Sequence, residues 1–139
     1  MNEAFKKKRK LTIDMAKREI IRSAAKKLFA DSGLDKTSVR EIARLAGYTT
    51  GAIYFHYANK EELYADILRE SMDRLLIAIN GALPENGDPI AKLVAGFGAL
   101  VHFYEKNPRD LDLSLYLLNG AHPRGLTPTL NKELNRKMC

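Results

Sequence analysis

The feature that most constrains the fold of this chain is a pair of very short predicted helices on either side of one glycine. The first, residues 38–46, opens with a Ser-x-x-Glu capping box at Ser38 and ends at Gly47 after barely two turns. The second, residues 50–57, starts at a threonine that can cap it. Helices this short are marginal in water, so neighbouring elements must hold both of them. The pair predicts a helix-turn-helix unit, although any helical bundle can contain two short helices.

Longer segments with helical periodicity surround this pair. Apolar residues recur at helical spacing over 13–30, 59–80 and 89–106, and a leucine-rich helix follows over 111–118. A last helix is predicted from Thr127 onward. No segment alternates as a strand would, and no internal repeat is present, so the sequence predicts an all-α fold.

The charge of the chain is concentrated in its first half. Residues 1–60 carry 14 Lys and Arg against 6 Asp and Glu, whereas residues 61–139 carry 9 against 11. This asymmetry suggests an anionic partner on one side of the molecule. The cationic run Lys6–Lys10 predicts a flexible basic arm over residues 1–12, which is either a solvated tail or a supplementary contact to DNA.

The second short helix has the composition of a surface that contacts DNA. It combines small, hydroxyl and aromatic residues where a core helix would carry Leu and Val. Threonine offers a hydroxyl to bases or phosphates and a methyl to thymine. Tyr54, His56 and Lys60 can donate hydrogen bonds to phosphate oxygens, and such contacts fix register without reading sequence.

Three segments of the chain resemble the TetR family of transcriptional regulators. Residues 33–43 are similar to that family's first-helix exit and second helix, 46–57 to its turn and recognition helix, and 59–63 to the start of its fourth helix. The similarity covers residues 15–70. It implies a three-helix helix-turn-helix DNA-binding domain followed by a helical ligand-binding and dimerisation domain.

The resemblance also implies a set of DNA-contacting residues. They are Thr37, Ser38, Arg40, Tyr48, Thr49, Thr50, Gly51, Tyr54, His56 and Lys60. Tyr48 stands where the family often has a small aliphatic residue, and it either packs into the turn or reaches the groove. Arg40 is either a DNA contact or a solvated helix residue, and His56 is either a phosphate contact or a packed or exposed histidine. Phe55 is predicted to belong to the core.

The resemblance divides the chain into a basic arm over 1–12, the helix-turn-helix domain over 13–58 and a helical regulatory domain over 59–139. Residues 59–80 form the connecting helix. Apolar residues of the regulatory domain line an effector pocket or belong to plain bundle core: Phe97, Val101, Tyr104, Leu115 and Leu118. Family members usually continue through two further helices that form the dimer interface, so this regulatory domain is expected to be incomplete. A homodimer is expected if those helices are present.

Other classes of function find little support in the sequence. The three histidines are far apart and have no Cys/His metal spacing around them, so neither a metal site, a cofactor nor an enzyme is expected. No apolar run approaches the length needed to span a bilayer, and the N-terminus lacks a signal-peptide core. A single cysteine, Cys139, suits a reducing compartment, and we expect a cytoplasmic protein.

These observations favour a ligand-responsive regulator that binds a palindromic operator in double-stranded DNA. It would most simply be a repressor that releases its operator when a small apolar or amphipathic effector binds. One alternative is an effector-independent structural DNA-associated protein on the same fold. Another is a helical ligand- or partner-binding module that no longer contacts DNA.

Overall fold

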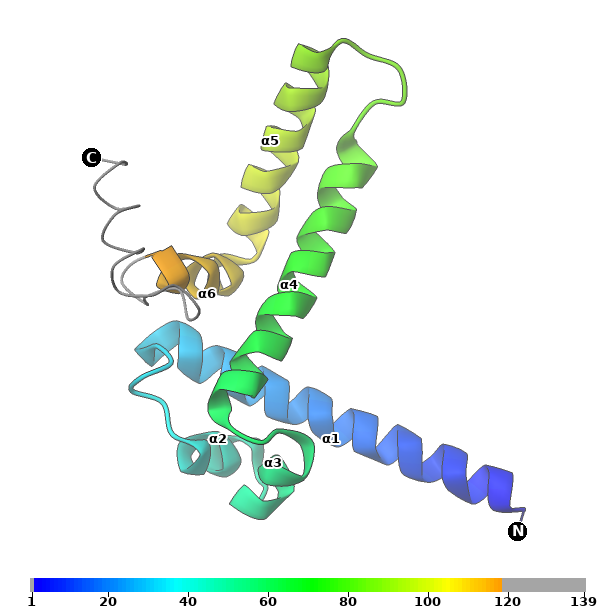
Figure 1. Cartoon of the computed structure of the whole chain (residues 1–139), viewed down its shortest axis with the longest axis vertical. Coiled ribbons are helices and arrows are strands. Elements are labelled where there is room, and N and C mark those ends of the chain that lie inside the picture. The colour runs from blue at the N-terminus through cyan, green and yellow to red at the C-terminus, as the bar shows by residue number, and fades with distance from the viewer. Residues whose placement is uncertain (1, 119–139) are drawn as a thin grey trace, which may run out of the picture.

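The computed structural model describes residues 2–118, which form six α-helices and no strand. The predicted all-α fold is therefore confirmed (Figure 1). The helices are α1 (Glu3–Ser32), α2 (Val39–Ala46), α3 (Thr50–His56), α4 (Lys60–Ala82), α5 (Pro89–Lys106) and α6 (Pro108–Leu118). The helix predicted from Thr127 lies outside the described residues.

Local caps define the two short helices as the sequence predicted. The Ser38 hydroxyl accepts from the backbone N–H of Glu41, and the Glu41 carboxylate accepts from that of Ser38 at 2.9 Å, which completes the capping box. Gly47 ends α2 in the left-handed region at φ 75°, a conformation that glycine adopts without strain. The Thr49 hydroxyl then accepts from Ala52 N at 3.2 Å and starts α3.

One hydrophobic core holds these helices together. Ile21 of α1, Ile42 of α2 and Ile53 of α3 are fully buried. They belong to one cluster with Leu63 of α4 and Leu113 of α6. The first turns of α4 and the middle of α6 therefore share the core of the helix-turn-helix unit, which explains how helices of eight and seven residues are held in place.

The first helix is longer than expected, because α1 begins at Glu3 and not at Ile13. The prediction that residues 1–12 form a flexible arm is wrong for residues 3–12. The Asn2 side chain caps the helix by accepting from Ala4 N at 3.3 Å, and Glu3 places a negative charge in the first turn. Lysine and arginine are good helix formers, so the cationic run continues the helix.

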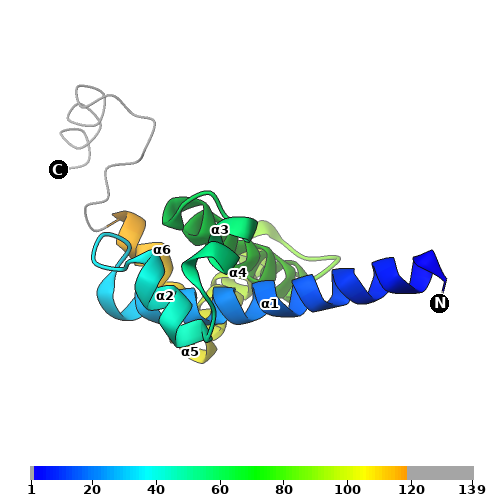
Figure 2. The same cartoon turned by 90° about the horizontal axis from the view of Figure 1, so that it is seen from below.

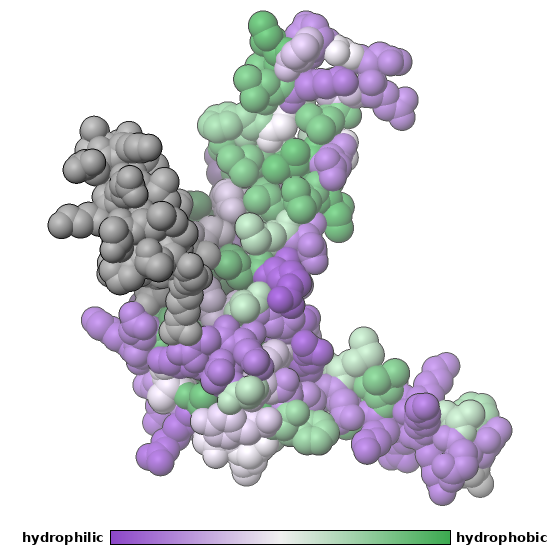
Figure 3. Space-filling model, in the orientation of Figure 1, coloured by the Kyte–Doolittle hydropathy of each residue, from purple (hydrophilic) through white to green (hydrophobic). Residues whose placement is uncertain are grey.

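The remaining helices give the molecule its shape. α4 and α5 run antiparallel as a tall hairpin that rises from the helix-turn-helix end, and α6 packs against α1 near the base of that hairpin (Figure 1). The hairpin carries an exposed apolar surface, whereas the base of the molecule is mostly hydrophilic (Figure 3). On α5 that surface includes Ile90, Leu93, Val94 and Phe97.

Candidate DNA-binding surface

The outer face of α3 is built from the residues that its anchors leave free. Ile53 is 1% exposed and Tyr57, which ends the helix, is 4% exposed, so they fix the face that α3 turns to the core. The other side is open to solvent. It carries Thr49, Thr50, Gly51, Tyr54 and Phe55.

Phe55 lies on this open face with 74% of its surface exposed, so its assignment to the core is wrong. It stands two residues after the buried Ile53, which places it on the opposite side of a 3.6-residue helix. Its ring lies nearly perpendicular to the neighbouring His56 ring, at 5.1 Å between centroids. Tyr54 beside it is 55% exposed. The phase set by Ile53 and Tyr57 would have identified Phe55 as a surface residue.

The residues that precede α2 divide into buried and exposed groups. Thr37 is 2% exposed, and its hydroxyl donates to the carbonyls of Gly33 at 2.8 Å and Leu28 at 3.3 Å. Its side chain therefore holds the loop between α1 and α2, and its DNA contact stays a prediction. Ser38 and Arg40 are exposed at the start of α2, where they remain available to a ligand.

Lys60 also has a structural role that the sequence did not indicate. Its ammonium donates to three carbonyls of the α1–α2 loop, those of Leu34 at 2.7 Å, Thr37 at 3.0 Å and Asp35 at 3.3 Å. An ammonium has three protons, so all of its donors are engaged. Lys60 therefore ties the start of α4 to the loop, and its phosphate contact stays a prediction.

Tyr48 and His56 lie at the edges of the open face. Tyr48 is half-buried and packs against the core cluster, which corresponds to the packing alternative for this residue. His56 is half-buried in the last turn of α3, next to the rings of Phe55 and Tyr57. Both side chains therefore pack against neighbouring residues and are only partly accessible from the open face.

A polar network fixes the end of α3 to α1 and α4. The Tyr57 hydroxyl donates to Asp66 at 2.7 Å and accepts from Arg18 Nε at 3.0 Å. Arg18 and Arg22 also reach the Asp66 carboxylate, at 3.2 and 3.5 Å. Burial raises the pKa of Tyr57 to about 12. Burial acts to raise the pKa of Asp66, but the Tyr57 hydrogen bond and the two arginines lower it below its ordinary value.

A second polar cluster joins α6 to α1 and α4. Asp110 is 2% exposed and contacts Lys26 of α1 at 2.8 Å and Arg74 of α4 at 2.6 Å. Burial acts to raise the pKa of Asp110, but the Lys26 and Ser71 hydrogen bonds and the Arg74 charge leave it below its ordinary value. Neither this network nor the one at Tyr57 was identified from the sequence, because each joins residues far apart in the chain.

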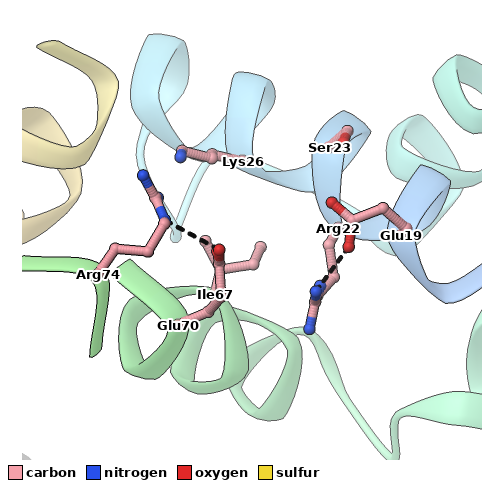
Figure 4. A pocket seen from close by; sticks show the side chains of 7 residues that line it. All are labelled: Glu19, Arg22, Ser23, Lys26, Ile67, Glu70 and Arg74. Carbon is pink, nitrogen blue, oxygen red and sulfur yellow. Dashed lines mark hydrogen bonds and ion pairs between the residues drawn. The ribbon is translucent and has the colours of Figure 1, made fainter. Parts of the chain in front are cut away.

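A shallow pocket between α1 and α4 lies beside this cluster, and its walls are mostly charged (Figure 4). Arg22 pairs with Glu19 at 2.6 Å, and Arg74 pairs with Glu70 at 2.9 Å. The full lining is Glu19, Arg22, Ser23, Lys26, Ile67, Glu70 and Arg74. Because its charged groups largely pair with one another, the pocket does not resemble the apolar effector site that the sequence suggested.

The predicted effector residues lie on α5 and α6 without being enclosed. Phe97 is 65% exposed and Val101 is 43% exposed on the open face of α5. The Tyr104 hydroxyl lies 3.3 Å from the Ser114 hydroxyl. The side chain of Leu115 is partly exposed. The side chain of Leu118 lies outside the described residues. A shared pocket of these residues stays a prediction.

Within residues 2–118, His, Cys, Asp and Glu do not gather in groups of three that could hold a metal ion. None of the described helices is both long and apolar enough to cross a membrane.

The part of the chain that carries this surface is similar to known proteins. Residues 21–67 match the family model described as bacterial regulatory proteins, tetR family. The chain is 34% identical over 91 residues to the HTH-type transcriptional repressor KstR2 of Mycolicibacterium smegmatis, which covers 63% of this chain and 44% of that protein. It is 39% identical over 79 residues to the HTH-type transcriptional regulator AcrR of Shigella flexneri, covering 55% and 36%.

A solved structure gives the same result at the level of the fold. The ketosteroid transcriptional regulator KstR2 of Mycobacterium tuberculosis superposes with a TM-score of 0.66 at 27% identity. The match covers 87% of this chain and 63% of that structure. The chain thus spans less than half the length of the two curated relatives and under two thirds of the solved one.

Proposed function

We propose that the protein is a TetR-family transcriptional regulator that binds double-stranded DNA through α3, and the match of residues 21–67 to that family's model supports the proposal. The observation that carries the proposal is the open face of α3. In a helix-turn-helix unit the second helix lies in the major groove with its first residues against the base edges. Here those first residues are small or hydroxyl-bearing, and Ile53 behind them is locked in the core.

The individual side chains suit different parts of a DNA site. Thr50 and Gly51, at the start of α3, allow close approach to base edges, and the threonine offers both a hydroxyl and a methyl. Tyr54 presents a hydroxyl that can donate to a phosphate. Ser38 and Arg40 lie at the start of the neighbouring α2, where they can contact the backbone of the same duplex.

We further propose that the α5 side of the molecule belongs to a regulatory part that responds to a small apolar or amphipathic effector. The exposed apolar face around Phe97 and Val101 supports this assignment, because a large uncovered apolar face marks a binding surface. Binding of the effector would influence the DNA-binding end through contacts between helices, such as that of Asp110 with Lys26. Repression, a homodimer, a palindromic operator and a cytoplasmic location are parts of the same proposal.

The test begins with in vitro selection of duplexes from a random pool by the full chain. Fluorescence anisotropy then compares the selected duplex with a scrambled one. We expect a preference of about 10³-fold or more. A Thr50→Ala/Tyr54→Ala variant should lose that preference, whereas the control Lys92→Ala/His102→Ala, changed at exposed positions of α5, should keep it.

The competing outcome is equal binding of both duplexes with a steep dependence on salt, which is the signature of purely electrostatic contact. That result would reject a sequence-reading regulator. It would favour an effector-independent structural DNA-associated protein, a candidate that the cationic first half of α1 supports. Protection of a single promoter in a genome-wide binding experiment would argue against this second candidate.

A further inference from the structure

The first half of α1 projects from the body of the protein. Every residue from Asn2 to Ile20 is exposed except Asp14, which is half-buried. Figure 2 shows this part of the helix extending well beyond α2, α3 and α4. At 1.5 Å per residue, residues 3–17 span about 22 Å.

Lysines form a stripe along one side of this projecting helix. Lys17 and Lys10 precede the buried Ala24 by seven and fourteen residues, and Lys6 lies one turn before Lys10. Residues spaced this way share one side of a helix. Lys6, Lys10 and Lys17 also line one shallow groove on the helix surface, which places them together. The stripe therefore continues the side of α1 that packs onto the rest of the domain.

The projecting half of α1, which carries this lysine stripe, lies at the end of the molecule that holds α2 and α3 (Figure 1). In Figure 1 the helix crosses above these two helices and descends to their level at its N-terminal end. Seen from below in Figure 2, α2 and α3 lie beside the inner half of α1 and the cationic half extends past them. We propose that the lysine stripe binds the phosphate backbone of the DNA that flanks the site contacted by α3, an inference that rests on the proposed function.

Charge and shape favour DNA over other partners. Residues 3–17 carry six cationic side chains against two carboxylates, Glu3 and Asp14, and Glu3 lies 4.0 Å from Lys6. Leu11 and Met15 stand on nearly the opposite side of the helix from Ile13, which is two residues from each. The helix therefore has no single apolar side of the kind that a membrane surface or a partner helix would bind.

The length of the arm sets the size of the effect. With a rise of about 3.4 Å per base pair, 22 Å of helix lies along roughly six base pairs of flanking duplex. Each phosphate neutralised by a cation contributes about 0.9 to the slope of log K against log salt. Three lysines on three phosphates would therefore account for a slope of about 2–3.

The experiment measures that slope for the full chain on a generic duplex of about 30 base pairs, and again on a duplex recovered by selection. The variant Lys6→Gln/Lys10→Gln/Lys17→Gln removes the stripe. The control Lys8→Gln/Lys27→Gln/Lys92→Gln removes the same charge at exposed positions outside the stripe, one of them on the same projecting helix. Circular dichroism checks that both variants keep the helical content of the wild type.

We expect the stripe variant to lower the slope by about 2–3 and the control variant by less than 1. Equal losses in the two variants would overturn the proposal, because net charge alone would then explain them. An unchanged slope in the stripe variant would overturn it as well. Failure of the proposed function gives a different result. The protein would then select no sequence, while the stripe variant could still lower the slope of log K against log salt on the generic duplex.

Discussion

Replacement of Asp110 by asparagine should destabilise the protein far more than the same change at an exposed position of α6. The Asp110 carboxylate is 2% exposed and accepts from Lys26 at 2.8 Å and Arg74 at 2.6 Å. Asp110→Asn keeps the shape of the side chain and removes its charge. Lys26 then loses its carboxylate partner and Arg74 keeps only Glu70, in a site where α1, α4 and α6 meet.

The magnitude follows from the burial of the three groups. Breaking a fully buried ion pair costs about 3–5 kcal/mol. The side chains of Lys26 and Arg74 are 24% and 35% exposed, so water can partly solvate them after the change. We therefore expect the free energy of unfolding to fall by about 2–3 kcal/mol, which corresponds to a loss of roughly 10 °C in Tm.

Urea denaturation followed by circular dichroism measures this change, with linear extrapolation to water. Asp112→Asn is the matched control, because it removes the same charge from an exposed position of the same helix and should cost less than about 0.5 kcal/mol. A double-mutant cycle with Lys26→Met should give a coupling energy of about 1 kcal/mol or more. A loss below about 1 kcal/mol for Asp110→Asn, or an equal loss for both asparagine variants, would refute the reasoning.

Three other changes test the remaining features. Tyr57→Phe removes hydrogen bonds to Arg18 and Asp66 and should lower the free energy of unfolding by about 1–2 kcal/mol in urea titrations, so full stability would contradict the network. Phe55→Ala should change stability by less than about 0.5 kcal/mol but weaken binding to a selected duplex about fivefold in anisotropy, and undiminished affinity would exclude a contact. Because their pKa values are lowered in the fold, Asp66 and Asp110 stabilise the protein above about pH 5, and this stability should disappear in thermal melts as the pH falls below about 4. If the Tm of Asp66→Asn or Asp110→Asn falls as steeply with decreasing pH as that of the wild type, that assignment would be contradicted.

The parts of the fold that the sequence predicted well are those encoded by near neighbours. The capping box at Ser38, the glycine at Gly47 and the threonine at Thr49 each act within a few residues. They set the ends of α2 and α3 regardless of what packs around them. The helix-turn-helix unit could therefore be predicted before any tertiary contact was known.

The features of the predicted site that the sequence did not reveal depend on contacts between distant residues and on the phase of a short helix. Lys60 and Thr37 carry polar groups that suit DNA, but the carbonyls they contact belong to the α1–α2 loop, and no local pattern indicates this. Phe55 was assigned to the core on its apolarity alone, although Ile53 and Tyr57 already defined the buried side. The cationic run was predicted to be flexible because the repulsion between its charged side chains was given more weight than the helix propensity of lysine.

The shared core has a consequence for how this chain can be divided and recombined with others. Leu63 and Ile67 of α4 and Leu113 of α6 are buried in the same cluster as the helix-turn-helix residues. A chimera joined at residue 58 would leave the helix-turn-helix unit without these three side chains. The loss would create a cavity in the interior of that unit. A junction between α4 and α5 would still lack Leu113. The smallest transplantable module of this protein therefore extends through α6, and any exchange of further segments should begin beyond it.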